Sequence, residues 1–203
     1  IVYGVLLRDL PYDKPNQLVR VGFLTPGFPG QGDFQSDATY FHFARSARSF
    51  AALGMYATSD DHYVTGGVAP ERVTVALMTP NMFTLLGVRP ILGKLFAPGD
   101  TSWYGQSLLP VLISEDLWRR RYGGDLSVIG RRIDTDLGAR AIVGVLPRAF
   151  AFPTESVDLY FPSPVPVNHP QVTARSVSVI GRLRQGVTTR QAQAERNARV
   201  PSL

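Results

Sequence analysis

The clearest pattern of apolar and polar positions lies between Arg72 and Gly93. Alternation and β-branched residues predict a strand over Val73 to Met78, and a short apolar run predicts a helix over Asn81 to Leu86. That helix is flanked by residues suited to a cap, to the first helical position and to a left-handed exit: Thr79, Pro80 and Gly87. None of these side chains is a good acid, base, nucleophile or metal ligand, so the stretch indicates packing rather than catalysis.

Further short elements are predicted on both sides of this stretch. Before it come a strand (Leu18 to Phe23), a helix (Tyr40 to Arg48, capped by Ser36 or Asp37) and two strands (Phe50 to Tyr56, His62 to Gly66) joined by a turn at Asp60-Asp61. After it come a strand (Val111 to Ile113, bounded by Pro110), a helix from Ser114 to Tyr122, a hairpin (Ile129 to Leu146) around Asp136-Leu137-Gly138, and a strand (Val157 to Pro162). A last strand (Ser176 to Arg184) leads to a helix in which Thr188 and Gln191 have the spacing of a capping box.

Composition narrows the class of protein. The 203 residues are 44% hydrophobic and 18% charged, which is typical of a folded chain. There are no cysteines, so disulfides, thiolate nucleophiles and cysteine-based zinc sites are excluded. The net charge of +5 is spread along the chain rather than clustered, which argues against nucleic-acid binding. No phosphate-binding loop motif is present.

The chain starts with an apolar segment, Ile1 to Leu7, that is too short to span a bilayer. Because the first residue is not Met, we expect this sequence to be part of a longer gene product. The segment has two interpretations: the end of a transmembrane helix, or an ordinary N-terminal helix or strand.

The histidines offer little chemistry by their spacing. His42, His62 and His169 form no pair at helical spacing, so a histidine-based metal site would need residues from distant parts of the chain. Asp60 and Asp61 with His62 could bind a cation, but a polar turn is the simpler interpretation.

Each remaining candidate position has a structural alternative. Ser114 with Glu115 resembles a nucleophile beside a carboxylate, but no GxSxG surrounds it and a helix cap explains it. The other candidates are a carboxylate pair (Asp134, Asp136), a phosphate-binding or acid-binding run (Arg119, Arg120, Arg121) and ligand-facing aromatic residues (Trp103, Tyr104, Phe150). The simpler interpretations are a solvated hairpin for the carboxylates, a helix C-terminus for the arginines and core or interface packing for the aromatic residues. The sequence therefore assigns no catalytic, cofactor-binding or metal-binding residue.

Several segments, in the same order over nearly the whole chain, carry a family resemblance. The most recognisable is Thr79-Pro80-Asn81-Met82-Phe83 with Leu86-Gly87-Val88-Arg89-Pro90 and Gly93. The others include Leu6 to Tyr12, Pro70 to Val73, Val111 to Ser114, Leu117 to Gly124, Val128 to Arg131, Val143 to Pro147, Phe150 to Pro153, and Gly181 to Leu183 with Gly186 to Thr188. Together they resemble the extracytoplasmic core domain of MacB-like ABC transporter permeases.

This resemblance implies an α+β fold in two parts. A porter-like βαβ subdomain would be formed by both chain ends, residues 1–75 and 171–203. A smaller α/β subdomain, residues 76–170, would be inserted between them. In the family this domain lies between the first and second transmembrane helices.

The resemblance also implies a function. The domain would be non-catalytic, would lie on the periplasmic side of the bacterial cell membrane, and would transmit ATP-driven motion to export a substrate or act on an envelope partner. No cofactor is expected in this chain, because ATP and Mg would be bound by a separate ATPase. The expected partners are that ATPase, a second permease copy and an envelope protein, but not nucleic acid. The competing hypotheses are a stand-alone envelope binding module and a carboxylate-based hydrolase.

Overall fold

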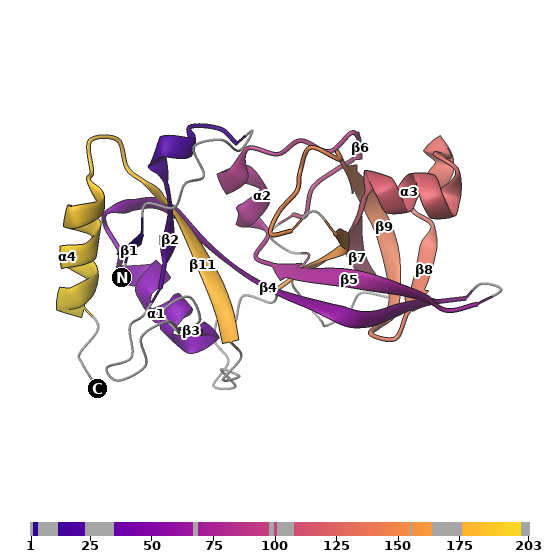
Figure 1. Ribbon diagram of the computed structural model, residues 1–203, viewed down its shortest axis with the longest axis horizontal. Coiled ribbons are helices and arrows are strands. Elements are labelled where there is room, and N and C mark those ends of the chain that lie inside the picture. The colour runs from indigo at the N-terminus through magenta and orange to yellow at the C-terminus, as the bar shows by residue number, and fades with distance from the viewer. Residues whose placement is uncertain are drawn as a thin grey trace. The chain divides into compact units, whose positions relative to one another are not determined.

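The chain folds into a mixed α+β structure, as predicted. The computed structural model describes residues 2–3, 12–22, 35–66, 69–97, 100, 108–154, 156–163 and 176–199. The strands are β1 (Val2–Tyr3), β2 (Leu18–Val21), β3 (Gln35–Ser36), β4 (Phe50–Thr65), β5 (Glu71–Met78), β6 (Leu92–Gly93), β7 (Leu109–Ser114), β8 (Arg132–Thr135), β9 (Gly138–Leu146), β10 (Val157–Pro162) and β11 (Ser176–Leu183). The helices are α1 (Asp37–Ser46), α2 (Asn81–Leu86), α3 (Glu115–Tyr122) and α4 (Thr189–Arg199) (Figure 1).

The chain divides into two compact units. Unit 1 contains Ile1–Met55, Leu85–Gly87 and Pro166–Leu203, and unit 2 contains Tyr56–Thr84 and Val88–Val165. The first boundary lies inside β4, twenty residues earlier than the expected end of the first segment at residue 75. Residues 56–75 belong to unit 2 because this part of β4 pairs with β5 and β8.

Unit 1 is built on the antiparallel pair of β2 and β11, in which Val21 lies opposite Val179. Alternating valines point into its core, so Val19, Val21, Val177 and Val179 are all buried. Helix α4 starts with the predicted capping box: the Thr188 hydroxyl accepts from the Gln191 N–H at 3.3 Å, and the Gln191 side chain accepts from the Thr188 N–H at 2.9 Å.

Unit 2 contains a closed ring of strands. Successive pairings run β4–β5–β10–β7–β9–β8, and β8 returns to β4. The ring surrounds a cluster of buried side chains: Val64, Val73, Val75, Val111, Ile113, Leu117, Trp118, Val128, Ile133, Ile142, Val145, Leu159 and Phe161. In a closed ring each of these strands has a hydrogen-bonded neighbour on both sides. The ring also shields the apolar cluster from water.

The stretch singled out from the sequence forms the predicted elements. Strand β5 is followed by α2, and Gly87 after that helix has a φ of 73°. Met82, Phe83, Leu85 and Leu86 are all buried. The apolar pattern of this helix therefore belongs to packing, as expected.

The turn predicted at Asp60-Asp61 is wrong. Strand β4 runs without interruption through both aspartates, and its pairing with β5 shifts register between Ser59 and His62. The one extra residue on β4 forms a bulge, and both aspartates are exposed there. Pro110 also lies inside β7 rather than before it, opposite Ala141 near the start of the strand, where proline is tolerated.

The two described residues of the apolar N-terminal segment form a strand. Val2 and Tyr3 make up β1, which pairs antiparallel with β2, so these residues are not the end of a helix. Among the described residues, no helix combines the length and apolarity that crossing a bilayer requires.

The close approach of β6 to β9 can be tested at Gly93. A Cβ atom there would lie 2.2 Å from the Val143 carbonyl oxygen and 2.8 Å from Ile129 Cδ1, at a φ of 74°. We expect Gly93→Ala to lower the free energy of unfolding by about 3 kcal/mol or more, since strain and overlap add. Gly130→Ala is the matched control, because Gly130 has a φ of 86° but nothing within 4 Å. It should cost only about 1 kcal/mol in urea denaturation. Equal losses would contradict this packing.

Candidate functional site

The most connected group of polar side chains in unit 2 surrounds helix α3. This helix starts where predicted, with the Ser114 hydroxyl accepting from the Leu117 N–H at 3.2 Å, and ends at Gly123 with a φ of 61°. Leu117 and Trp118 bury one face of the helix in the ring core. Its last turn carries the three consecutive arginines Arg119, Arg120 and Arg121, at the end where the helix dipole favours positive charge.

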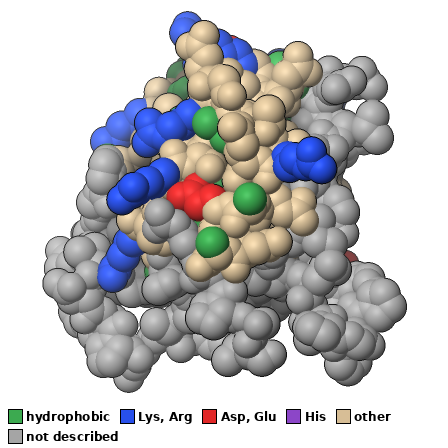
Figure 2. Space-filling view, turned by 90° about the vertical axis from the view of Figure 1, so that its left-hand side faces the viewer, with side chains coloured by type: hydrophobic (Ala, Val, Ile, Leu, Met, Phe, Trp, Pro, Cys, Tyr) green, Lys and Arg blue, Asp and Glu red, His purple; other side chains and the backbone are tan. Residues whose placement is uncertain are grey.

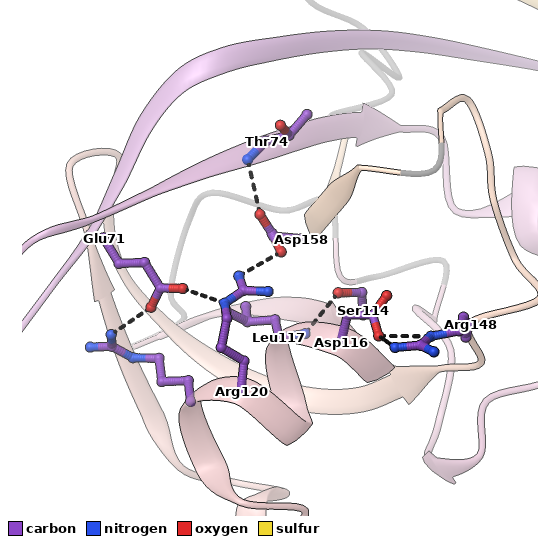
Figure 3. Close-up of polar contacts among 9 residues, drawn as sticks. Glu71, Thr74, Ser114, Asp116, Leu117, Arg120, Arg148 and Asp158 are labelled. Atoms are coloured by element: carbon purple, nitrogen blue, oxygen red, sulfur yellow. Dashed lines mark hydrogen bonds and ion pairs between the residues drawn. The ribbon is translucent and has the colours of Figure 1, made fainter.

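Arg120 bridges two strands of the ring. Its Nε donates to Glu71 of β5 at 2.7 Å, and its Nη2 donates to Asp158 of β10 at 2.9 Å (Figure 3). Arg121 donates to the other oxygen of Glu71 at 3.0 Å. One guanidinium therefore ties α3 to two parallel strands. We call Glu71, Arg120, Arg121 and Asp158 the arginine brace.

Asp158 also accepts a backbone hydrogen bond where the pairing of β5 with β10 is irregular. The register of β10 against β5 shifts between Val157 and Leu159, so Asp158 stands at a bulge. At that place the Thr74 N–H donates to Asp158 Oδ2 at 3.3 Å (Figure 3). The carboxylate thus accepts from a backbone donor of β5 beside the irregularity, which keeps that donor hydrogen-bonded.

Within the brace, the ion pairs favour the charged forms of Glu71 and Arg120. Burial acts to raise the pKa of the Glu71 carboxyl, but the hydrogen bonds and charges of Arg120 and Arg121 outweigh it and lower that pKa below its ordinary value. Burial likewise acts to lower the pKa of Arg120, and the bonds to Asp158 and Glu71 outweigh it and raise that pKa. The two shifts are those expected of an ion pair between Glu71 and Arg120.

A second set of contacts anchors the start of α3. Glu115 accepts from Arg119 at 2.8 Å and from the backbone N–H of Arg148 at 3.0 Å. Figure 3 shows the neighbouring pair of Asp116 with the Arg148 side chain. Hence each arginine of the run Arg119 to Arg121 contacts a carboxylate of this chain. Phosphate or an acidic partner would have to compete with those carboxylates.

The carboxylates proposed as a pair have separate partners. Asp136 accepts from His62 at 3.0 Å and from the Tyr63 N–H at 3.2 Å, whereas Asp134 contacts Arg132 at 2.7 Å. Asp60 contacts Arg72 instead. Burial acts to raise the pKa of Asp136, but the bonds from His62 and Tyr63 outweigh it and lower that pKa. In the described part of the chain, no three His, Asp or Glu side chains are placed to hold a metal ion.

The remaining candidates are core residues or lie outside the described residues. Phe150 is buried, with its ring 5.9 Å from that of Phe83 and 5.6 Å from that of Tyr160. Trp103, Tyr104, His169 and the side chain of His42 are outside the described residues.

The sequence interpretation missed Glu71 and Asp158 as members of this site. A single carboxylate in the otherwise apolar run Val157 to Phe161 was a usable signal, since a charge in a buried strand needs a cation nearby. Glu71 gave no such signal, because it stands at the first, half-buried position of its strand, next to the exposed Arg72.

Comparison with known proteins agrees with this fold. The family model described as the MacB-like periplasmic core domain matches residues 6–198. No curated protein sequence gives a significant match. The periplasmic region of MacB from Actinobacillus actinomycetemcomitans superposes with a TM-score of 0.66 at 14% identity, covering 89% of this chain and 80% of that one.

Two further solved structures are similar. The extracellular domain of the noncanonic ABC-type transporter YknZ from Gram-positive bacteria gives a TM-score of 0.62 at 11% identity, covering 86% of this chain and 88% of that one. A domain of a putative permease protein from Porphyromonas gingivalis gives a TM-score of 0.56 at 20% identity, covering 82% of this chain and 71% of that one. At these identities the likeness concerns the fold.

The brace can be tested by comparing two aspartates. Asp158→Ala should lower the free energy of unfolding by about 2 to 3 kcal/mol, because it removes a partner of Arg120 and leaves the Thr74 N–H without its acceptor. Asp116→Ala removes an exposed pair and should cost less than about 1 kcal/mol. Urea denaturation measures both variants. The brace is disproved as a stabilising unit if the two losses are the same.

We expect the free energy of unfolding to depend on pH through the Glu71 carboxylate. Because its pKa is lowered in the folded state, the stability that it contributes is present above the unfolded pKa of about 4.3 and is lost as the pH falls below it. Glu71→Gln cannot titrate. We therefore expect the variant to be less stable than the parent at pH about 6, and the difference to shrink at pH about 3.5. A difference that stays constant in urea denaturation would refute the assignment.

Proposed function

Since this chain belongs to the family of MacB-like periplasmic core domains, we propose that it is a non-catalytic ectodomain that transmits ATP-driven motion across the membrane. In this proposal a cytoplasmic ATPase binds ATP and Mg, the transmembrane helices of the permease relay the motion, and the ectodomain moves. That motion exports a substrate or acts on an envelope partner.

One observation carries the proposal. The family match extends over residues 6–198 and so includes sequence from both units. A match of that extent concerns the whole arrangement of the chain rather than one motif. The similar solved structures are described as regions of a MacB protein, an ABC-type transporter and a permease, which supports the same role.

The contacts within unit 2 suit a mechanical role. A part that transmits displacement must resist deformation itself, because strain absorbed locally is not passed on. The closed ring has a dense apolar core, and the arginine brace connects α3 to β5 and β10 across its surface. Densely packed interiors have low compressibility and transmit strain.

The carboxylate-based hydrolase has less support. It needs two carboxyl groups held around one substrate, with distinct acid and base roles. Asp134 and Asp136 instead contact Arg132 and His62 respectively. For an envelope binding module that works without a transporter, no contact in the described residues speaks in its favour.

The proposal includes partners and a location. The domain would lie on the periplasmic side of the bacterial cell membrane, connected to the ATPase through the helices of the permease. Full-length permeases would pair as homodimers, and an envelope protein would receive the motion.

The location can be tested by cysteine labelling, because the chain contains no cysteine. Gln185→Cys in unit 1 and Leu126→Cys in unit 2 place thiols at exposed positions of the full-length permease. We expect a membrane-impermeant maleimide to label both in intact spheroplasts. Val111→Cys, at a fully buried position, should stay unlabelled in the folded protein.

A cysteine in the cytoplasmic ATPase serves as the sidedness control and should react only after the spheroplasts are lysed. If Gln185→Cys and Leu126→Cys also require lysis, the domain is cytoplasmic and the proposed function fails.

A further inference from the structure

One face of unit 1 is basic. Figure 2 shows several Lys and Arg side chains on the side of the molecule that carries α4, with one acidic patch among them. Arg45 lies in the last turn of α1, Arg48 follows that helix, Arg184 follows β11 and Arg190 lies in the first turn of α4. All four side chains are exposed. We call Arg45, Arg48, Arg184 and Arg190 the arginine face.

Hydrogen bonds to backbone carbonyl groups orient Arg184 within this face. Arg184 donates its Nε to the Arg48 carbonyl at 2.9 Å, and its N–H donates to the Ser49 carbonyl at 3.0 Å. Only the Nε of this guanidinium is used there, and its Nη groups can still donate to a ligand. A guanidinium that is already oriented loses less conformational entropy on binding an anion.

The carboxylate next to these arginines is occupied. Glu195 of α4 accepts from the backbone N–H of Arg48 and from that of Ser49, both at 2.7 Å. It therefore anchors α4 to the turn that follows α1. By contrast, no side-chain ion pair within the described residues neutralises Arg45, Arg48, Arg184 or Arg190.

The residues around the arginine face favour the binding of phosphate groups over the binding of a protein partner. Protein interfaces depend on buried apolar or aromatic anchors at their centre. The exposed large apolar side chains are Tyr63, Ile91, Leu126, Ile129 and Leu137, and all of them belong to unit 2. In the described part of unit 1 no large apolar side chain is exposed. Exposed arginines without anchors suit phosphate groups, which guanidinium binds through paired hydrogen bonds.

We propose that the arginine face binds the anionic phospholipid headgroups of the membrane to which the domain is tethered. This inference rests on the proposed function, since it requires unit 1 to be held next to a bilayer. Both β1 and α4, the first and last described elements of the chain, belong to unit 1. Flanking membrane helices would therefore keep this unit near the headgroups, where individually weak charge contacts act at high effective concentration.

Vesicle binding by the 203-residue chain tests the proposal. The probes are vesicles of phosphatidylglycerol and phosphatidylcholine in equal parts, and vesicles of phosphatidylcholine alone. We expect sedimentation with the anionic vesicles only, weakening as salt screens the charges. Each basic residue near an anionic surface contributes about 1 kcal/mol, or roughly fivefold in the partition coefficient. Arg45→Gln with Arg48→Gln should therefore reduce partitioning roughly 25-fold.

Two matched variants separate this face from net charge. Arg89→Gln with Lys94→Gln removes two exposed charges from unit 2 and should leave partitioning within about twofold, apart from long-range attraction. Arg45→Lys with Arg48→Lys keeps the charge and should retain most of the binding. Thermal unfolding midpoints equal to that of the parent establish that the variants are folded. Equal losses in the two glutamine variants overturn the proposal, as does parent binding to both kinds of vesicle or to neither.

A negative result here is distinguishable from failure of the proposed function. Vesicle binding reports only on the arginine face, whereas maleimide labelling of Gln185→Cys and Leu126→Cys reports on location. The domain could show the expected maleimide labelling, fail to bind anionic vesicles and be pulled down by an acidic envelope protein. That result would show that the arginine face binds a protein and not lipid headgroups.

Discussion

The structure of unit 2 depends on the closure of six strands into a ring. The pairing that completes it is short, since β4 meets β8 only at Val64 with Thr135 and at Thr65 with Asp134. Asp136 extends this seam by accepting from the Tyr63 N–H and contacting His62. Without closure, β4 and β8 would expose open edges and the buried cluster around Val111 and Leu159 would meet water. The burial of this cluster therefore depends on closure of the ring.

Several charged residues in this unit stabilise the closed ring. Arg120 connects Glu71 and Asp158 on neighbouring strands, and Asp158 also satisfies the Thr74 backbone. In unit 1 the equivalent role falls to Glu195, which fixes α4 to the turn after α1. Among the described residues of unit 1, the exposed arginines are Arg45, Arg48, Arg184 and Arg190.

Local signals made much of this fold predictable from the sequence. The helix α3 begins at Ser114 and α4 at Thr188 because capping needs only residues within one turn, and both predictions are confirmed. The continuous strand β4 was missed since Asp60-Asp61 has the composition of a turn, and only pairing with β5 reveals the bulge. The partners of Arg120 lie 49 and 38 residues away in the chain, so no local pattern could identify them.

If the ring transmits motion as proposed, its strand pairing should stay intact when the transporter binds ATP. Hydrogen exchange of the full-length permease with its ATPase, in lipid nanodiscs with ADP or a non-hydrolysable ATP analogue, measures this directly. The account predicts equal protection of the amides of Val111 to Ile113 and Leu159 to Phe161 in both nucleotide states. Faster exchange of those amides with the ATP analogue would show that the ring opens, and would contradict a rigid transmitting element.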